Sequence, residues 1–159
     1  MNKTYLLLGS NMGNSQLQLT RAKNNISKQI GIIIRQSKLY ITSAWGNTNQ
    51  SDFLNQVIVV ETQLSSIKTM QTILAIEKQM GRLRTVKNAP RLIDIDILYF
   101  NKEVIDIKLL RLPHPEIQNR RFVLIPLNEL SPNFLHPLFG KSNHQLLTDC
   151  NDELNVKKF

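Results

Sequence analysis

Short hydrophobic runs and longer segments with helical spacing divide the first two thirds of the chain into six predicted elements. Tyr5-Leu6-Leu7-Leu8 and Val57-Ile58-Val59-Val60 are continuous apolar runs of strand length. Between Leu19 and Ile30, in contrast, apolar residues recur every three or four positions, as on one face of a helix. The pattern predicts helices over residues 15–30 and 65–80, and strands over residues 4–8, 32–40, 53–61 and 91–100.

The predicted order is strand-helix-strand-strand-helix-strand. This order is typical of a ferredoxin-like α+β sandwich, in which an antiparallel sheet carries both helices on one face. Loops are expected over residues 41–52 and 81–90. With no repeat or linker, residues 1–159 are expected to form a single domain with an irregular C-terminal extension.

The last third of the chain has weaker patterns. It predicts an extended segment over residues 103–112, a break at Pro113-His114-Pro115 and a helix over residues 121–130 that Pro126 interrupts. The tail after residue 131 is expected to be irregular, with a short helix near residues 144–148.

Composition narrows the class of protein. No apolar run approaches the roughly 20 residues of a membrane helix, and Met1-Asn2-Lys3 leads directly into a strand without a cleavage site. The single cysteine, Cys150, excludes an internal disulfide framework and a cysteine-cluster zinc site, so a cytoplasmic location is expected. The formal net charge of +8 favours a phosphate-rich partner without saying which one.

Asp94 and Asp96 form the strongest local feature. Residues two apart in a strand share a face, so both carboxylates point the same way while Ile93 and Ile95 point into the core. Hard oxygen ligands at this spacing suit Mg²⁺, which keeps waters and completes its shell with substrate phosphates. The alternative is an exposed sheet face with ordinary acids, and the motif is too short to exclude it.

A basic segment precedes this pair, with four cations in ten residues: Arg82, Arg84, Lys87 and Arg91. A guanidinium can bind phosphate oxygens in a bidentate manner, so the segment suits a triphosphate with bound Mg²⁺. Taken alone, it is better explained as a solvated charge run. Glu77 extends the apolar face of the preceding helix and is expected either at a pocket rim or at the end of an exposed stripe.

Aromatic and amide residues supply a second candidate site. Phe53 and Asn55 share one strand face, and Phe122 lies near the start of the last helix. An aromatic ring with an amide can hold a flat heterocycle. Burial in the core is the simpler explanation for both phenylalanines, and His114 on its rigid turn is a weak signal by itself.

Together these segments resemble the 6-hydroxymethyl-7,8-dihydropterin pyrophosphokinases of folate biosynthesis, over nearly the whole chain. The most specific match is residues 87–98, which fit the family signature throughout. The other matches are Leu8-Gly9-Ser10-Asn11, Tyr40-x-Thr42, Asp52-Phe53-Leu54-Asn55, Glu77 with Gly81-Arg82-x-Arg84, Pro113-His114 and Asn119-Arg120-x-Phe122.

The resemblance implies transfer of the β,γ-diphosphate of ATP to the hydroxymethyl group of 6-hydroxymethyl-7,8-dihydropterin, with release of AMP. By position, Asp94 and Asp96 would bind two Mg²⁺ ions, and Arg82 and Arg91 would be catalytic. The residues implied to bind ATP are Glu77, Arg84, Lys87, Ile97, Arg111, His114 and Arg120. The residues implied to bind the pterin are Thr42, Ser43, Trp45, Phe53, Asn55 and Phe122.

Four residues depart from the family pattern near the nucleotide. Asn88 stands where a tryptophan often lies, Thr85 where a lysine is common, Leu74 in place of a frequent glutamine, and Pro115 in place of a tyrosine. These departures concern adenine contacts and loop closure. They leave the metal pair and the pterin-binding residues intact.

Two other functions stay open at this level. A ferredoxin-like nucleic-acid-binding module would fit the basic charge, but it needs aromatics on the sheet face, where the sequence offers Asp94 and Asp96. A metal-dependent transferase acting on another heterocycle is opposed only by the pterin-binding residues. The expected partners are ATP and the pterin, with no nucleic acid and no membrane, and the protein is expected to be a monomer.

Overall fold

The computed structural model describes residues 1–42, 51–81 and 92–159. Among these residues, six strands form one sheet in the order β5-β1-β4-β3-β8, and β2 also pairs with β4. All the pairings are antiparallel. The strands are β1 (Asn2–Ser10), β2 (Gly31–Gln36), β3 (Tyr40–Thr42), β4 (Phe53–Thr62), β5 (Asp94–Phe100) and β8 (Val156–Lys158).

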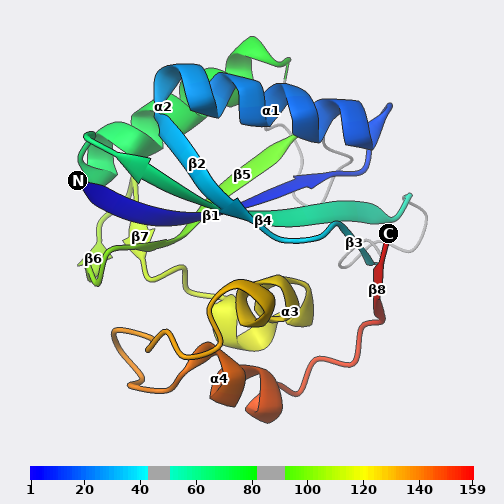
Figure 1. The fold of residues 1–159 in the computed structure, drawn as a ribbon, viewed down its shortest axis with the longest axis vertical. Coiled ribbons are helices and arrows are strands. Elements are labelled where there is room, and N and C mark those ends of the chain that lie inside the picture. The colour runs from blue at the N-terminus through cyan, green and yellow to red at the C-terminus, as the bar shows by residue number, and fades with distance from the viewer. Residues whose placement is uncertain (43–50, 82–91) are drawn as a thin grey trace.

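Helices cover both faces of this sheet (Figure 1). On one face lie α1 (Ser15–Gln29) and α2 (Ser66–Gln79). On the other lie α3 (Arg121–Leu130), which follows the short 3₁₀ helix η1 (Ile117–Asn119), and α4 (Asn143–Asp149). The order of elements from β1 to β5 confirms the predicted ferredoxin-like α+β fold. No helix in the described ranges is long and apolar enough to cross a membrane.

Alternation along the strands builds a hydrophobic core on each face of the sheet. Leu8 and Ile58 pack into the core beneath α1 and α2, whereas Leu7 and Val57 pack into the core beneath α3. Ile95 and Ile97 of β5, and Ile93 just before it, join the first core, as the alternation predicts. Asp94 and Asp96 therefore belong to the face that α3 covers.

The predicted helices begin at side-chain caps. The side chain of Asn14 accepts a hydrogen bond from the Leu17 N–H (3.1 Å), and that of Ser65 accepts one from the Lys68 N–H (3.1 Å). Each cap satisfies an N–H group that has no partner within its helix. The short helix expected near residues 144–148 is α4, which starts with a capping box between Ser142 and Gln145.

The single strand expected over residues 32–40 is two strands. The Ser37 N–H donates to the Val57 carbonyl oxygen (2.8 Å), and the Ser37 hydroxyl oxygen accepts from the Val57 N–H (3.0 Å). The Ser37 side chain thus replaces a main-chain acceptor, and a register shift precedes it between Ile33 and Arg35. The predicted start of the loop expected over residues 41–52 is also too early, because Ile41 and Thr42 belong to β3.

The segments after β5 are more ordered than the sequence suggests. Within the extended segment over residues 103–112, β6 (Ile105–Asp106) pairs with β7 (Arg111–Leu112) in a separate antiparallel sheet. The tail forms β8 against β3, and the Phe159 N–H donates to the Leu39 carbonyl oxygen (2.9 Å). β8 is too short to carry a recognisable alternation.

Candidate active site

The predicted metal-binding and pterin-binding residues share one face of the sheet. Gly9 of β1 pairs with Asn55 of β4 on one side and with Asp94 of β5 on the other. Thr42 of β3 pairs with Phe53, two residues before Asn55. Because directly paired residues point to the same side, these side chains lie on the face that α3 covers.

Gly9 keeps the centre of this face open. A Cβ on Gly9 would lie 2.9 Å from the Asn55 Oδ1 and 3.9 Å from the Phe53 Cδ1. At the shorter distance the Asn55 amide would have to shift. Gly9 belongs to the Leu8-Gly9-Ser10-Asn11 match, but its neighbours in the sequence indicate no role for it. The crowding involves Asn55, 46 positions away, which only the strand register brings close.

Asn55 and Thr42 each place on this face a polar atom that has no partner among the described residues. Each is 3% exposed, and among the described residues neither the Asn55 Nδ2 nor the Thr42 Oγ1 makes a hydrogen bond. Most buried polar groups in proteins are paired, because an unpaired one costs desolvation free energy. Unpaired groups on a site face are free to bond a ligand.

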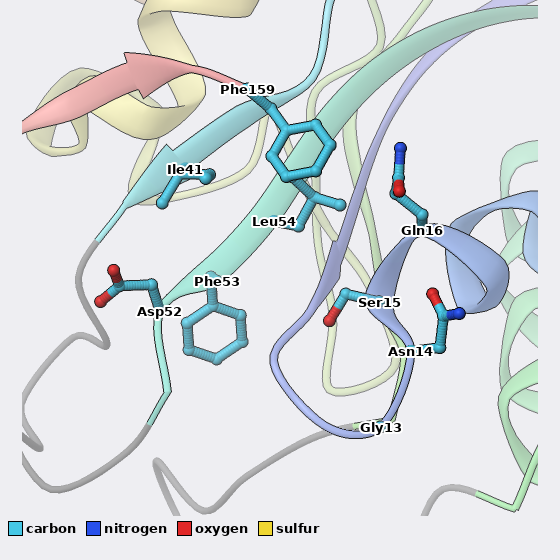
Figure 2. Close-up of a pocket in the computed structure, with 9 residues that line it drawn as sticks. All are labelled: Gly13, Asn14, Ser15, Gln16, Ile41, Asp52, Phe53, Leu54 and Phe159. Atoms are coloured by element: carbon cyan, nitrogen blue, oxygen red, sulfur yellow. The ribbon is translucent and has the colours of Figure 1, made fainter.

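Phe53 and Phe122 are only partly buried, so the explanation that both are core residues is incomplete. Phe122 packs against the core beneath α3, and the Arg120 Cζ lies 5.8 Å from the centroid of its ring. Phe53 also lines a pocket of about 370 Å³ beside the start of β4 (Figure 2). In that view the N-terminus of α1 and Phe159 form the other walls.

Asp94 and Asp96 are partly exposed, while Ile95 between them is fully buried toward the opposite face. Within the described ranges, no three His, Cys, Asp or Glu residues are grouped so as to hold a metal ion. Two carboxylates alone do not make a closed structural site. They fit Mg²⁺, which takes its remaining oxygen ligands from water and substrate phosphates.

Glu77 is buried at 2% exposure, so the exposed-stripe alternative is wrong. Its Oε2 accepts a hydrogen bond from the Ile95 N–H (2.8 Å). β5 ends the sheet order, and this edge N–H has no strand partner in the described part of the chain. Glu77 thereby holds the main chain of β5 between the two aspartates.

The turn after β7 brings His114 to β5. The His114 N–H donates to the Leu98 carbonyl oxygen (2.9 Å), and its Nδ1 accepts from the Glu116 N–H (3.1 Å). Burial, and then the charge of Arg120, lower the pKa of His114 to about 4. The carboxylates of Glu116 and Asp94 act on the same imidazole in the opposite direction. His114 therefore lies in a site with Asp94 and Arg120 and is neutral near pH 7.

Two residues predicted to bind ATP, Arg111 and Ile97, have side chains whose main contacts lie away from Asp94 and Asp96. The Arg111 Nε lies 3.2 Å from an exposed Asp106 carboxylate, although its charge still reaches His114 and contributes to lowering the pKa there. The Ile97 side chain is buried in the core beneath α1 and α2, which leaves its main chain for a nucleotide. The remaining predicted site residues lie outside the described residues: Ser43, Trp45, Arg82, Arg84, Lys87 and Arg91.

Residues 5–132 match the family model of 7,8-dihydro-6-hydroxymethylpterin-pyrophosphokinase (HPPK). A 2-amino-4-hydroxy-6-hydroxymethyldihydropteridine pyrophosphokinase from Aquifex aeolicus is 40% identical over 141 residues, which cover 89% of this chain and 88% of that protein. The enzyme of the same name from Pseudomonas aeruginosa is 32% identical over 151 residues, covering 94% of this chain and 93% of that one.

Longer proteins also contain a similar domain. The folic acid synthesis protein fol1 of Schizosaccharomyces pombe is 38% identical over 151 residues, and the match covers 94% of this chain but 20% of that protein. The crystal structure of Plasmodium falciparum HPPK-DHPS wild type with SDX-DHP superimposes with a TM-score of 0.74 at 19% identity. The superposition covers 93% of this chain and 43% of the Plasmodium chain, and it supports the assignment of the fold.

Proposed function

Since the chain belongs to the 7,8-dihydro-6-hydroxymethylpterin-pyrophosphokinase family, we infer that this sheet face is where it transfers the pyrophosphoryl group of ATP to hydroxymethyldihydropterin in folate synthesis. One observation carries the assignment of the face. Asp94 and Asn55 flank Gly9 in adjacent strands, so the carboxylate pair and the Asn55 Nδ2, which has no partner among the described residues, lie on the same face.

The pterin end of the site is assigned to β3, β4 and the start of α3. The Asn55 amide would bond the donor–acceptor edge of the pterin, and Phe53 and Phe122 would stack on its ring. The Thr42 main chain, with Ser43 and Trp45, would bond the rest of that edge. Because the Asn55 Nδ2, unpaired among the described residues, would gain a partner only when the correct edge is present, Asn55 would also discriminate against other heterocycles.

The nucleotide end is assigned to the turn at His114 and to the cations around it. Since the Nδ1 of neutral His114 accepts from the Glu116 N–H, its Nε2–H can donate to a phosphate oxygen, while Arg111 and Arg120 supply positive charge. Glu77 holds β5 in place, and Ile97 would offer its main chain. Arg84 and Lys87, outside the described residues, are proposed to bind the phosphates as well.

The reaction forms one bond and breaks another at the same phosphorus. The hydroxymethyl oxygen of the pterin bonds to the β-phosphorus of ATP, while the bond from that phosphorus to the α,β-bridging oxygen breaks. AMP leaves with that oxygen, and the hydroxyl proton passes to solvent. Arg82 and Arg91 are proposed to stabilise the charge that develops on the leaving oxygen.

We propose Mg²⁺ as the cofactor, two ions with each ATP, held by Asp94 and Asp96. When bound, such ions polarise phosphoryl oxygens as Lewis acids. The two carboxylates would otherwise repel the phosphates that this face has to accept. Their partial exposure leaves room for substrate oxygens to complete the metal shell.

The direct test is to incubate the protein with ATP, Mg²⁺ and 6-hydroxymethyl-7,8-dihydropterin. AMP and the pterin diphosphate should form in equal amounts, and chelation of the metal should stop the reaction. A pterin that lacks the hydroxymethyl group is the matched control and should give no AMP. Formation of ADP or inorganic phosphate would contradict the reaction class, and equal turnover of other heterocyclic alcohols would contradict the pterin assignment.

A nucleic-acid-binding module is the less favoured function. Its binding face would be the one that carries Asp94 and Asp96, and two carboxylates repel a phosphate backbone. We therefore propose a monomer whose partners are ATP and the pterin. Binding of single-stranded RNA at physiological salt in a gel-shift assay would contradict this proposal, as would a dimer in sedimentation analysis.

A further inference from the structure

A single carboxylate joins the end of α3 to the start of β3. Glu129 lies one residue before the end of α3 and accepts a hydrogen bond from the Tyr40 hydroxyl (2.5 Å). The same carboxylate accepts from the Lys38 N–H, at 3.1 Å and 3.3 Å for its two oxygens. These contacts connect residues about 90 positions apart in the sequence.

The two elements that Glu129 joins carry opposite walls of the pterin site. β3 ends at Thr42, whereas α3 begins next to Phe122. β3 has only three residues, and within the described chain it pairs with β4 and β8. Such a short strand relies on contacts outside its own ladder for its position relative to a helix on the sheet face.

The hydrogen bond from Tyr40 to Glu129 persists near neutral pH. Burial, the hydrogen bond to Glu129 and the Glu129 charge together raise the pKa of Tyr40 to about 12. The phenol therefore remains a donor near neutral pH. A hydrogen bond to an ionised acceptor is also stronger than one between neutral groups, although Glu129 is an exposed residue and solvent weakens this gain.

We propose that Glu129 is a positioning residue for the pterin site. Through Tyr40 and the Lys38 main chain it fixes β3 relative to α3, and so fixes the separation between the wall with Thr42 and the wall with Phe122. This inference rests on the proposed function, because it assumes that the pterin lies between those walls. Glu129 itself does not touch the substrate, and its loss should act on pterin binding rather than on nucleotide binding.

Steady-state kinetics of AMP formation test this separation of effects. Glu129→Ala should raise the KM for the pterin about fivefold, as for loss of a charge-assisted hydrogen bond at a partly exposed site, with the KM for ATP within about twofold of wild type. Glu129→Gln keeps an acceptor oxygen and should recover part of the loss. Tyr40→Phe should raise the pterin KM, and its effect should not add fully to that of Glu129→Ala.

Glu103→Ala is the matched control. The Glu103 Oε1 also accepts from a hydroxyl, that of Ser66 at 2.7 Å, but it follows the end of β5 opposite to Asp94. This variant should leave the KM for the pterin unchanged. Hydrogen exchange gives a local readout: the Lys38 amide should exchange faster in Glu129→Ala, while the Ser37 amide, which bonds Val57, should not change.

The outcomes separate the two proposals. A wild-type protein that forms no AMP would overturn the proposed function, and this inference with it. An active wild type whose pterin KM is unaffected by Glu129→Ala would overturn only the positioning role. So would an equal rise in both KM values, because a general structural defect does not distinguish the two substrates.

Discussion

Removing the Asn55 amide should stabilise the free protein and weaken pterin binding at the same time. Asn55 is buried, and its Nδ2 has no hydrogen-bond partner among the described residues. Such a donor costs about 1–3 kcal/mol in desolvation. In Asn55→Ala this cost disappears, and the small cavity left behind offsets about 1 kcal/mol of the gain. The free energy of unfolding should therefore rise by about 1 kcal/mol.

In the complex with the pterin, the Asn55 amide should instead contribute favourably to the free energy of binding. Loss of a donor and an acceptor, each contributing about 0.5–1.5 kcal/mol, should weaken pterin binding about ten- to a hundredfold. Urea denaturation of the free protein measures the first effect. Calorimetric titration of the pterin, with a non-hydrolysable ATP analogue present, measures the second.

Thr69→Val provides the control for this prediction. Thr69 of α2 is fully buried, and its hydroxyl also has no partner within the described ranges, but it belongs to the opposite side of the sheet. This variant should gain stability without any change in pterin affinity. The reasoning is refuted if Asn55→Ala lowers the stability of the free protein while it retains wild-type pterin binding.

Three further predictions concern the metal pair, Gly9 and pH. Asp96→Asn should lower kcat about a hundredfold or more and raise the Mg²⁺ concentration needed for half-maximal turnover, and unchanged kinetics would contradict the metal assignment. Gly9→Ala should displace the Asn55 amide and raise the KM for the pterin with little change for ATP, and equal changes in both would count against it. Burial lowers the pKa of His114 and of His136 to about 4, so the unfolded chain binds more protons below about pH 6.5. The contribution of these histidines to the free energy of unfolding should be fully present above that pH. It should fall toward pH 4, by up to about 1.4 kcal/mol per pH unit for each histidine. Constant urea midpoints from about pH 7 to pH 4.5 would disprove this.

Local patterns predicted the parts of the fold and site that depend on neighbours in the sequence. The period-two alternation in β5 placed Ile95 in the core and put Asp94 and Asp96 on the other face. Apolar residues at helical spacing, such as those between Leu19 and Ile30, located α1. These features depend on residues only a few positions apart, where spacing is a reliable guide to direction.

Contacts between residues that are distant along the chain left no pattern in the sequence from which they could be predicted. The hydrogen bond from Tyr40 to Glu129 and the close approach of Gly9 to Asn55 arise only when the strands and α3 are assembled. The single strand expected over residues 32–40 was wrong because the Ser37 side chain replaces a main-chain partner in the ladder, which hydrophobicity does not register. β8 was missed because it has only three residues and takes its strand geometry from pairing with β3.

Under the proposed function, the register around Gly9 also limits the size of the substrate. Asn55 and Asp94 both pair with this one residue, so their main chains are two strand spacings apart, about 10 Å. Hydrogen bonding between the strands fixes that spacing, and with it the distance between the end proposed to bind the pterin ring and the end proposed to bind the phosphates. Under the proposed function, an alcohol whose arm is one carbon longer is expected to place its oxygen less well for the reaction. In that proposal the backbone ladder, rather than any single side chain, selects the length of the arm.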